Sequence, residues 1–162
     1  MDADPICKSK HAEAPLSEAL VLGEGNTMGN VFVQVTSGLP AGKNYTAPAK
    51  PVVVTQKGCK YAPHVFGVMA GQPVKFLNPD GTLHNVHALP KKNREFNLAM
   101  PANRTEAEKN FSKPEPFFPI KCDVHPWMSA YIGVLPHSFF AVTDENGQYD
   151  ISGLPDGDYT LE

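Results

Sequence analysis

Short apolar runs separated by turn residues recur along the chain, and long 3.6-residue apolar patterns are missing. Runs of this length rich in Val, Ile, Phe and Tyr are typical of β-strands. The predicted strands are "NVFVQV" from Asn30, "PVVVTQ" from Pro51, "HVFGVM" from His64, "PVKFLN" from Pro73, "AYIGVL" from Ala130, "FFAVT" from Phe139, "QYDIS" from Gln148 and "DYTLE" from Asp158. This spacing predicts an all-β sandwich or barrel of antiparallel strands.

The connections between these runs are of two kinds. Turn residues interrupt the chain at "NPDGTL", "DENGQ" and "LPDGDY", where Asn-Gly and Asp-Gly supply positions with positive φ. The segment 90–119 instead lacks strand character. We expect it to be a long surface excursion between two strands, with room for a short helix near Glu106.

Length and charge narrow the class of protein. With 162 residues the chain can form one large domain or two small ones, and its formal net charge is -3. No basic stripe is present, so we expect no nucleic-acid partner. No apolar run approaches the roughly 20 residues of a membrane-spanning helix, and the N-terminus lacks the apolar core of a signal peptide. These features indicate a soluble chain, either cytoplasmic or exported with its signal removed.

The common enzyme motifs are missing from the sequence. It contains no G-x-S-x-G elbow, no H-E-x-x-H helix and no Gly-rich phosphate loop. It also lacks the His-x-His pairs that a multicopper oxidase needs. We therefore expect a protein that is not an enzyme.

The stretch "KCDVHPWMSAY" gathers three potential metal ligands between the strand-like run "FFPIK" and the predicted strand "AYIGVL". Cys122, His125 and Met128 follow a C-x2-H-x2-M spacing. A loop can turn all three toward one ion, whereas a strand sends alternate side chains to opposite faces. Thiolate, imidazole and thioether together favour copper over magnesium or calcium, and Met is a poor ligand for zinc. The alternative is that the three side chains fill the core.

A fourth ligand is available from the separate segment "LHNVHAL". It contains His84 and His87, which follow a strand and a turn. The two lie three residues apart, so in an extended strand they point to opposite faces and only one can reach a given ion. A His from a second segment strengthens the metal interpretation over core filling.

Both motifs resemble those of the amicyanin-type cupredoxins. "CDVHPWM" resembles their copper-binding loop, with Pro directly after the His and an aromatic residue before the Met, and "LHNVHAL" resembles the segment that carries their first His ligand. The resemblance covers residues 51–136 and implies a cupredoxin-like Greek-key β-sandwich. It also implies one mononuclear type 1 copper that alternates between Cu(I) and Cu(II). The implied ligands are His84, Cys122, His125 and, as the long axial ligand, Met128.

The same resemblance assigns roles around the metal. Asn85 would tie the two ligand-bearing segments together by hydrogen bonds. The ring edge of His125 would reach solvent through an apolar patch and serve as the electron port, with Pro126 and Trp127 nearby. Trp127 has the alternative of packing under the loop, and His87 is expected to be a surface or structural residue.

The cysteine count is informative once one thiol is assigned to copper. If Cys122 is a ligand, Cys7 and Cys59 remain as an even pair. A disulfide between them would staple the N-terminal segment to the copper domain and, by closing a loop of about fifty residues, contribute about 4 kcal/mol. The alternative is two free, buried thiols. A disulfide would favour a periplasmic or other extracytoplasmic location.

The flanks of the copper region carry a second resemblance. "NVFVQVTSGLP" before it and "FFAVTDENGQYDISGLPDGDYTLE" after it resemble the two halves of a carboxypeptidase-regulatory-like, transthyretin-type β-sandwich. Residues 51–136 would then be a cupredoxin domain inserted between 1–50 and 137–162. The simpler alternative is a single cupredoxin with extra strands packed on it.

These observations predict a copper protein that carries single electrons between a redox donor and a redox acceptor. A copper delivery or storage protein could use the same ligands without redox turnover and is the main alternative. A third hypothesis is a sensing or adhesion sandwich whose metal site is vestigial.

Overall fold

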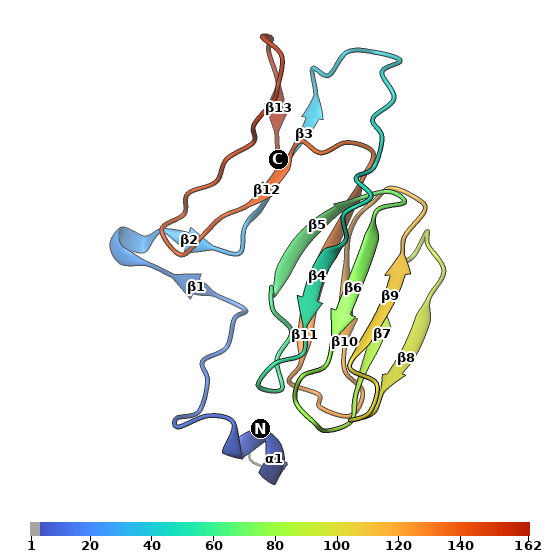
Figure 1. Cartoon of the computed structure of the whole chain (residues 1–162). Helices are drawn as coiled ribbons and strands as arrows, with labels where there is room; N and C mark the ends of the chain where they lie inside the picture. The colour runs from blue at the N-terminus through green and yellow to red at the C-terminus, as the bar shows by residue number, and fades with distance from the viewer. Residues whose placement is uncertain (1–3) are drawn as a thin grey trace.

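The computed structural model describes residues 4–162, and strands make up most of its regular structure (Figure 1). The helical segments in this range are α1 (Pro5–Ser9) and the 3₁₀ helix η1 (Glu24–Asn26). Neither is long and apolar enough to cross a membrane. The strands are β1 (Val21–Leu22), β2 (Met28–Gly29), β3 (Phe32–Ser37), β4 (Val52–Thr55), β5 (Val65–Met69), β6 (Pro73–Leu77), β7 (His84–Ala88), β8 (Phe96–Met100), β9 (Glu106–Asn110), β10 (Glu115–Lys121), β11 (Ser129–Leu135), β12 (Phe140–Val142) and β13 (Thr160–Leu161).

Strands β4 to β11 form a sandwich of two sheets. The larger sheet has the order β5-β11-β10-β7-β8 and the smaller one the order β4-β6-β9. The predicted all-β sandwich is thus confirmed, but the expectation of antiparallel strands throughout is wrong. β5 pairs with β11 in parallel, and so does β4 with β6. Between β4 and β6 the chain runs through β5 in the other sheet, and such a crossover brings it back in its original direction.

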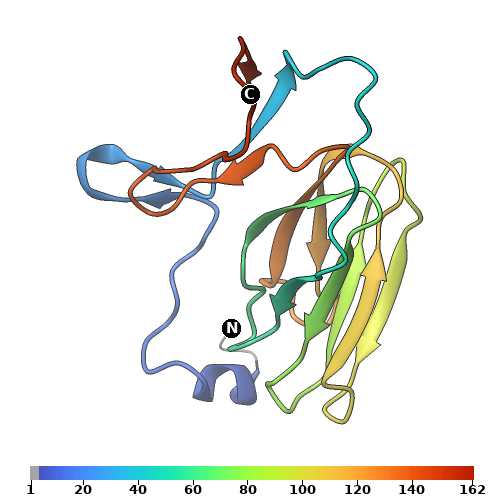
Figure 2. The same cartoon turned by 45° about the horizontal axis from the view of Figure 1, so that its top comes forward.

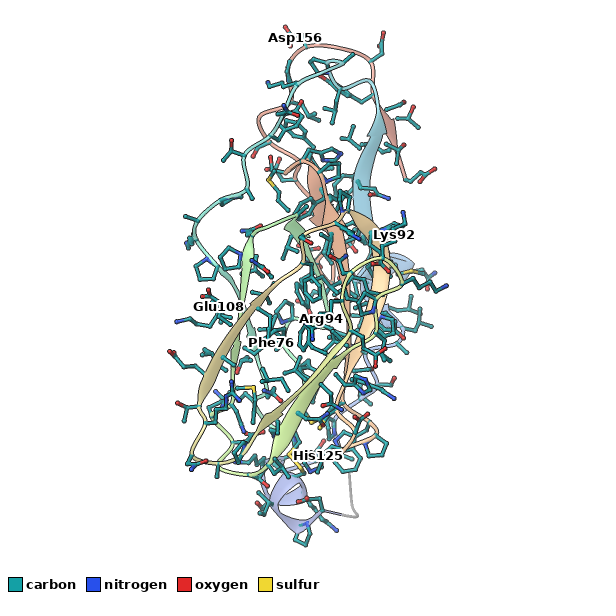
Figure 3. All side chains as sticks on the ribbon, turned by 90° about the vertical axis from the view of Figure 1, so that its right-hand side faces the viewer. Phe76, Lys92, Arg94, Glu108, His125 and Asp156 are labelled. Carbon is teal, nitrogen blue, oxygen red and sulfur yellow. A yellow bond between two sulfur atoms is a disulfide. The ribbon has the colours of Figure 1, made fainter. Side chains whose placement is uncertain are left out.

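The core lies between the two sheets, because alternate side chains of each strand point inward. In β6, Val74 and Phe76 are fully buried and their neighbours are not, and Figure 3 shows Phe76 inside the sandwich. The largest fully buried apolar side chains are Tyr61, Phe111, Met100, Ile120, Met128 and Ile132. This packed interior gives the loops at its ends a stiff base.

The segment 90–119 is not the surface excursion that its sequence indicated. It contains β8, β9 and the start of β10, and the residues around Glu106 form a strand and not a helix. β8 pairs with β7, and β9 pairs with β6, so both widen the sandwich. The pattern "FNLAM" of β8 does alternate, whereas "EAEKN" of β9 offers only Ala107 to the core. A polar edge strand of this kind leaves little signal in a sequence.

The flanks pair with each other outside the sandwich. β3 lies between β12 and β13 in one small sheet, and β1 pairs with β2 in another. β3 precedes the sandwich in sequence and β12 follows it. The chain leaves the flanking sheet after β3 and re-enters it before β12 on the same side (Figure 2). The predicted additional strands from the flanks are confirmed. The division into a domain of residues 51–136 and a discontinuous unit of 1–50 and 137–162 stays a prediction.

Aromatic side chains fasten the flanks to the outer face of the larger sheet. Phe32 of β3 stacks with Phe140 of β12 at 5.7 Å between ring centroids. Both rings lie over Gly67 of β5, where a Cβ atom would come within 2.3 Å of Phe140. Only glycine allows this close approach, because the β5 backbone itself is in contact with the rings. β5 is therefore covered on both faces, which explains its almost continuous apolar run.

One predicted strand, "QYDIS", is absent from the structure. Oδ1 of Asp144 accepts the backbone N–H groups of Asn146 and Gln148 at 2.8 and 2.9 Å. This side-chain turn takes up the N–H of Gln148, the first residue of the run, which a strand would need for its ladder. The other predicted runs each contain a strand.

Candidate metal centre

Two segments meet at the end of the sandwich nearest α1. β7 begins with His84, and the loop of residues 122–128 joins β10 to β11. Because β10 pairs with both β7 and β11, it holds the two segments side by side. Figure 3 shows His125 of the loop at this end of the molecule, next to α1. Side chains 41 positions apart in the sequence, those of His84 and His125, thus come into contact.

The loop closes on itself through two backbone hydrogen bonds. The N–H of Cys122 donates to the carbonyl of Met128 at 3.1 Å, and the N–H of Met128 donates to the carbonyl of His125 at 2.9 Å. Pro126 occupies the second position of the resulting tight turn, where its fixed φ is favourable. The closure brings Sγ of Cys122 to 3.7 Å from Nδ1 of His125.

Three of the predicted ligands converge on one point. Nδ1 of His84 lies 2.9 Å from Nδ1 of His125, and one ring nitrogen of each lies within 4.8 Å of Sγ of Cys122. The three side chains are buried, with at most 2% of their surface exposed. One thiol and two imidazoles that face one another in a site shielded from water are donors that suit copper. The residues present therefore fit the metal that the sequence indicated.

Met128 lies at the end of the same loop. Its backbone makes both of the hydrogen bonds that close the loop, and its side chain is 1% exposed. This placement keeps the thioether inside the protein at the ligand-bearing end of the sandwich. Its role as the axial ligand stays a prediction.

A carboxylate holds the outer nitrogen of His84. Nε2 of His84 lies 3.0 Å from Oδ2 of Asp80, which also accepts the backbone N–H of Cys59 at 2.7 Å. Burial raises the pKa of Asp80, but its hydrogen bonds from Cys59, Gly58 and His84 outweigh burial and lower the pKa overall. The pKa of His84 is lowered, chiefly by burial and against the effect of Asp80. A neutral ring that donates Nε2–H to Asp80 directs the lone pair of Nδ1 into the site.

A second carboxylate holds the outer nitrogen of His125. Nε2 of His125 lies 3.1 Å from Oδ2 of Asp4, and hydrogen bonds from Cys7 and from His125 lower the pKa of Asp4. The His125 ring also lies 5.2 Å from that of Trp127 between centroids, and its residue is 2% exposed. The expectation of a solvent-exposed His125 edge is therefore wrong, because the N-terminal segment covers it.

Asn85 connects the two ligand-bearing segments. Its Oδ1 accepts the backbone N–H of Asp123 at 2.7 Å and lies 3.2 Å from Sγ of Cys122. Its Nδ2 donates to Oδ1 of Asn97 in β8 at 2.6 Å. The buried hydroxyl of Tyr61 donates to the carbonyl of Asn85 as well. The side chain of Asn85 thus holds the start of the loop, at Cys122, to β7.

Trp127 packs under the loop. Its Nε1–H donates to the carbonyl of Cys59 at 3.2 Å, and its ring packs against the buried core. This arrangement corresponds to the alternative considered for Trp127 and not to an exposed contact residue. Pro126, in contrast, is exposed at the tip of the turn.

His87 lies away from the converging ligands. Its Nδ1 is 2.8 Å from Oδ2 of Asp123, and its Nε2 is 3.1 Å from Oε1 of Glu95. The alternation of β7 sends its side chain to the face opposite that of Val86, which is fully buried. His87 therefore links β7 to the loop through Asp123 and to the residue before β8 through Glu95.

The structure joins Cys7 and Cys59 in a disulfide, with 5.6 Å between their Cα atoms and 52 positions between them in sequence. Cys122 is a free, buried cysteine. The disulfide ties α1 to the turn that also carries the backbone donors to Asp80. The N-terminal segment is therefore bound directly beside the candidate site.

Asp4 and Asp80 are the site residues that sequence reasoning missed. Asp80 stands four residues before His84, in a turn motif where an acidic residue is ordinary. Asp4 lies 121 positions from its partner His125, and no local pattern relates the two. The spacing of Asp80 offered a weak signal, and that of Asp4 offered none.

No protein-family model and no curated protein matches the chain. Among solved structures, the chain is similar to the copper-containing nitrite reductase (NirK) from Thermus scotoductus SA-01, with 22% identity over 60% of this chain and 25% of that one, and a TM-score of 0.48. It is also similar to a mutant of amicyanin in the Cu(I) state, with 21% identity over 63% of this chain and 97% of that one, and a TM-score of 0.46. A third similar structure is a purple cupredoxin from Nitrosopumilus maritimus, with 18% identity, coverage of 51% and 98%, and a TM-score of 0.43. At these identities the similarity concerns the fold alone.

Proposed function

We propose that this protein is a type 1 copper protein that carries single electrons between redox partners. The observation that supports this most is the convergence of Sγ of Cys122 with one ring nitrogen each of His84 and His125, all within 4.8 Å. A thiolate with two imidazoles is the strong ligand set of such sites, and Met128 would supply a further, weak thioether ligand. Bound there, copper would supply a one-electron couple between Cu(I) and Cu(II).

The protein's part in this function is to keep its ligands still. Asp80 fixes the ring of His84, and Asn85 fixes the backbone next to Cys122. The loop carrying His125 is closed by its own backbone hydrogen bonds on a packed sandwich. Ligands that move little between two oxidation states require little reorganisation, and electron transfer is then fast.

The burial of the proposed ligands suits an electron carrier better than an enzyme. The converging ligands are buried, so there is little room for a substrate to reach the thiol or the imidazoles. The donor and the acceptor would be other redox proteins. The Cys7–Cys59 disulfide favours an oxidising compartment, such as the periplasm.

The test is the visible absorption and EPR spectrum of the purified protein with one equivalent of Cu(II). An intense thiolate charge-transfer band that bleaches reversibly with a mild reductant would support the proposal. Cys122→Ser should abolish that band while circular dichroism stays unchanged, because the side chains are nearly equal in size. A pale spectrum typical of nitrogen and oxygen ligands would contradict the proposal. Tight binding of Cu(I) with transfer to a chelator would then indicate delivery or storage.

A further inference from the structure

The N-terminal residues form a cap over the candidate site, here called the N-terminal cap and defined as residues 4–11. Figures 1 and 2 show α1 at the end of the sandwich opposite the flanking strands. Asp4 is the N-cap residue of α1, and its Oδ1 accepts the backbone N–H groups of Ile6 and Cys7 at 2.8 and 3.0 Å. Its other oxygen, Oδ2, lies 3.1 Å from Nε2 of His125. One carboxylate thus starts the helix and contacts a proposed ligand.

Three further contacts anchor the N-terminal cap to the sandwich. Cys7 forms the disulfide with Cys59. Nζ of Lys10 lies 3.5 Å from Oδ1 of Asp80, and Nε2 of His11 lies 2.7 Å from the carbonyl oxygen of Gly58. These anchors all reach the turn around residues 58–59 or the carboxylate that this turn binds. The position of Asp4 is therefore set by covalent, ionic and hydrogen-bonded contacts and not by the short helix alone.

The two imidazoles of the site are supported in the same way, each by a carboxylate. Asp80 takes the outer nitrogen of His84, and Asp4 takes the outer nitrogen of His125. An imidazole that donates its outer N–H to a carboxylate is held in one tautomer and one orientation, and its inner nitrogen becomes a stronger donor. A stronger donor and a nearby negative charge favour Cu(II), the more highly charged oxidation state, over Cu(I).

We propose that Asp4 is a positioning residue for the copper site, which holds the His125 ring through Nε2 and shifts the copper couple toward Cu(II). This inference rests on the proposed function, because it assigns His125 as a ligand. The N-terminal cap also closes the ring edge of His125 to solvent. Partner proteins must therefore exchange electrons over another part of the surface, or after displacement of the cap.

The variant Asp4→Asn separates the two tasks of this residue. Asn is as good an N-cap as Asp, so its side-chain oxygen can still accept from Ile6 and Cys7. In place of Oδ2, Asn has an uncharged amide N–H₂ group, which cannot accept a hydrogen bond from His125. Formation of the disulfide is checked by a thiol assay of the unfolded protein, which should still find only Cys122 free. Glu13→Gln is the matched control, because it removes an exposed negative charge close to the cap in sequence.

The reduction potential is measured for the copper forms of wild type, Asp4→Asn and Glu13→Gln at one pH. For Asp4→Asn we expect the couple to shift at least tenfold toward Cu(I), about 59 mV for one electron, and the affinity for Cu(II) to fall about 10- to 100-fold. Glu13→Gln should shift the potential much less. Equal potentials and affinities for wild type and Asp4→Asn would overturn the proposal.

A readout without copper distinguishes this proposal from the proposed function. In ¹⁵N NMR spectra of the metal-free protein, Nε2 of His125 should carry the proton in wild type and lose that preference in Asp4→Asn. If wild type gives no thiolate-to-copper band, the proposed function fails whatever the NMR result. If the band is present but the His125 tautomer is the same in both proteins, the role of Asp4 is wrong and the proposed function stands.

Discussion

The side chain of Asn85 lies against that of Cys122, with 3.2 Å between Oδ1 and Sγ. The same oxygen accepts the N–H of Asp123 at 2.7 Å, so it holds both the thiol and the backbone that follows it. Asn85 itself lies in β7, directly after His84. One amide group thus adds to the β10 pairings that hold the two ligand-bearing segments together.

Asn85→Ala should loosen the copper loop. Loss of its hydrogen bonds leaves the Asp123 N–H without its acceptor, and we expect a decrease of about 1–3 kcal/mol in the free energy of unfolding. The affinity for copper should fall about 10- to 100-fold, because the thiol is no longer held in place. Urea unfolding of the metal-free protein and competition with a chelator measure the two effects.

Asn97→Ala is the control for this substitution. Asn97 contacts the Nδ2 of Asn85 and Oδ2 of Asp123 but neither the thiol nor the loop backbone. It should reduce copper affinity far less than Asn85→Ala does. Equal copper affinities for Asn85→Ala and wild type would show that Asn85 does not position Cys122.

Trp127 should report copper binding through its fluorescence. It is the one tryptophan of the chain, so the emission has a single source. Its ring centroid lies 5.2 Å from that of His125, so a Cu(II) ion held by His125 would be close enough to quench the excited indole. We expect the emission to fall with added Cu(II) and to level off at one equivalent. Cys122→Ser should weaken this quenching, and unchanged emission during tight copper binding would place the metal elsewhere.

Strands β4, β5, β6 and β11 of the sandwich were readable from the sequence, because each is a short apolar run bounded by turn residues. β9 was missed because "EAEKN" is an edge strand with only Ala107 directed to the core. "QYDIS" was wrongly predicted as a strand: the sequence indicated the turn at "DENGQ" but not the hydrogen bond by which the Asp144 side chain takes the N–H of Gln148. Local pattern thus predicts strands that bury a face and fails where pairing or turn chemistry decides.

For the candidate site, the sequence supplied the residue types but not their environment. Cys122, His125 and Met128 share one loop, and a recognisable spacing therefore relates them. The covered edge of His125 depends on Asp4, which comes from the opposite end of the chain. A contact between residues 121 positions apart leaves no periodic or spacing signal in the sequence. No sequence feature therefore indicated that the edge of His125 is covered.

His87→Ala should leave the copper spectrum nearly unchanged, because His87 faces away from the converging ligands. It should nevertheless alter the pH dependence of stability. The carboxylates of Glu95 and Asp123 accept hydrogen bonds from His87 and raise its pKa above the ordinary value, against the effect of burial. The bond with His87 is in turn the main reason that the pKa of Asp123 is lowered to about 2. The folded protein thus favours the charged forms of both residues.

The sign of this effect follows from linkage. A raised pKa in the folded state means that protonated His87 stabilises the fold below about pH 6.5, its unfolded value, and that this stabilisation is lost as pH rises through the folded pKa. The contribution of ionised Asp123 to the stability of the fold is lost in the opposite direction, as pH falls from about 4 toward 2. The stability difference between wild type and His87→Ala should be largest between about pH 4 and 6.5. A difference that grows above pH 8 in urea unfolding would contradict this assignment.

Removal of the Cys7–Cys59 disulfide should destabilise the protein and release the N-terminal cap together. In the chain-entropy model, a cross-link between residues 52 positions apart contributes about 4 kcal/mol to the free energy of unfolding. We expect the double variant Cys7→Ser, Cys59→Ser to lose most of this amount in urea unfolding of the metal-free protein, and reduced wild type to behave in the same way. The ring of His125 should also become accessible, because Asp4 and Lys10 are then held only by non-covalent contacts. Faster loss of copper to a chelator than in wild type would reveal this second effect. If the double variant loses stability but releases copper at the wild-type rate, the disulfide stabilises the fold without controlling access to the site.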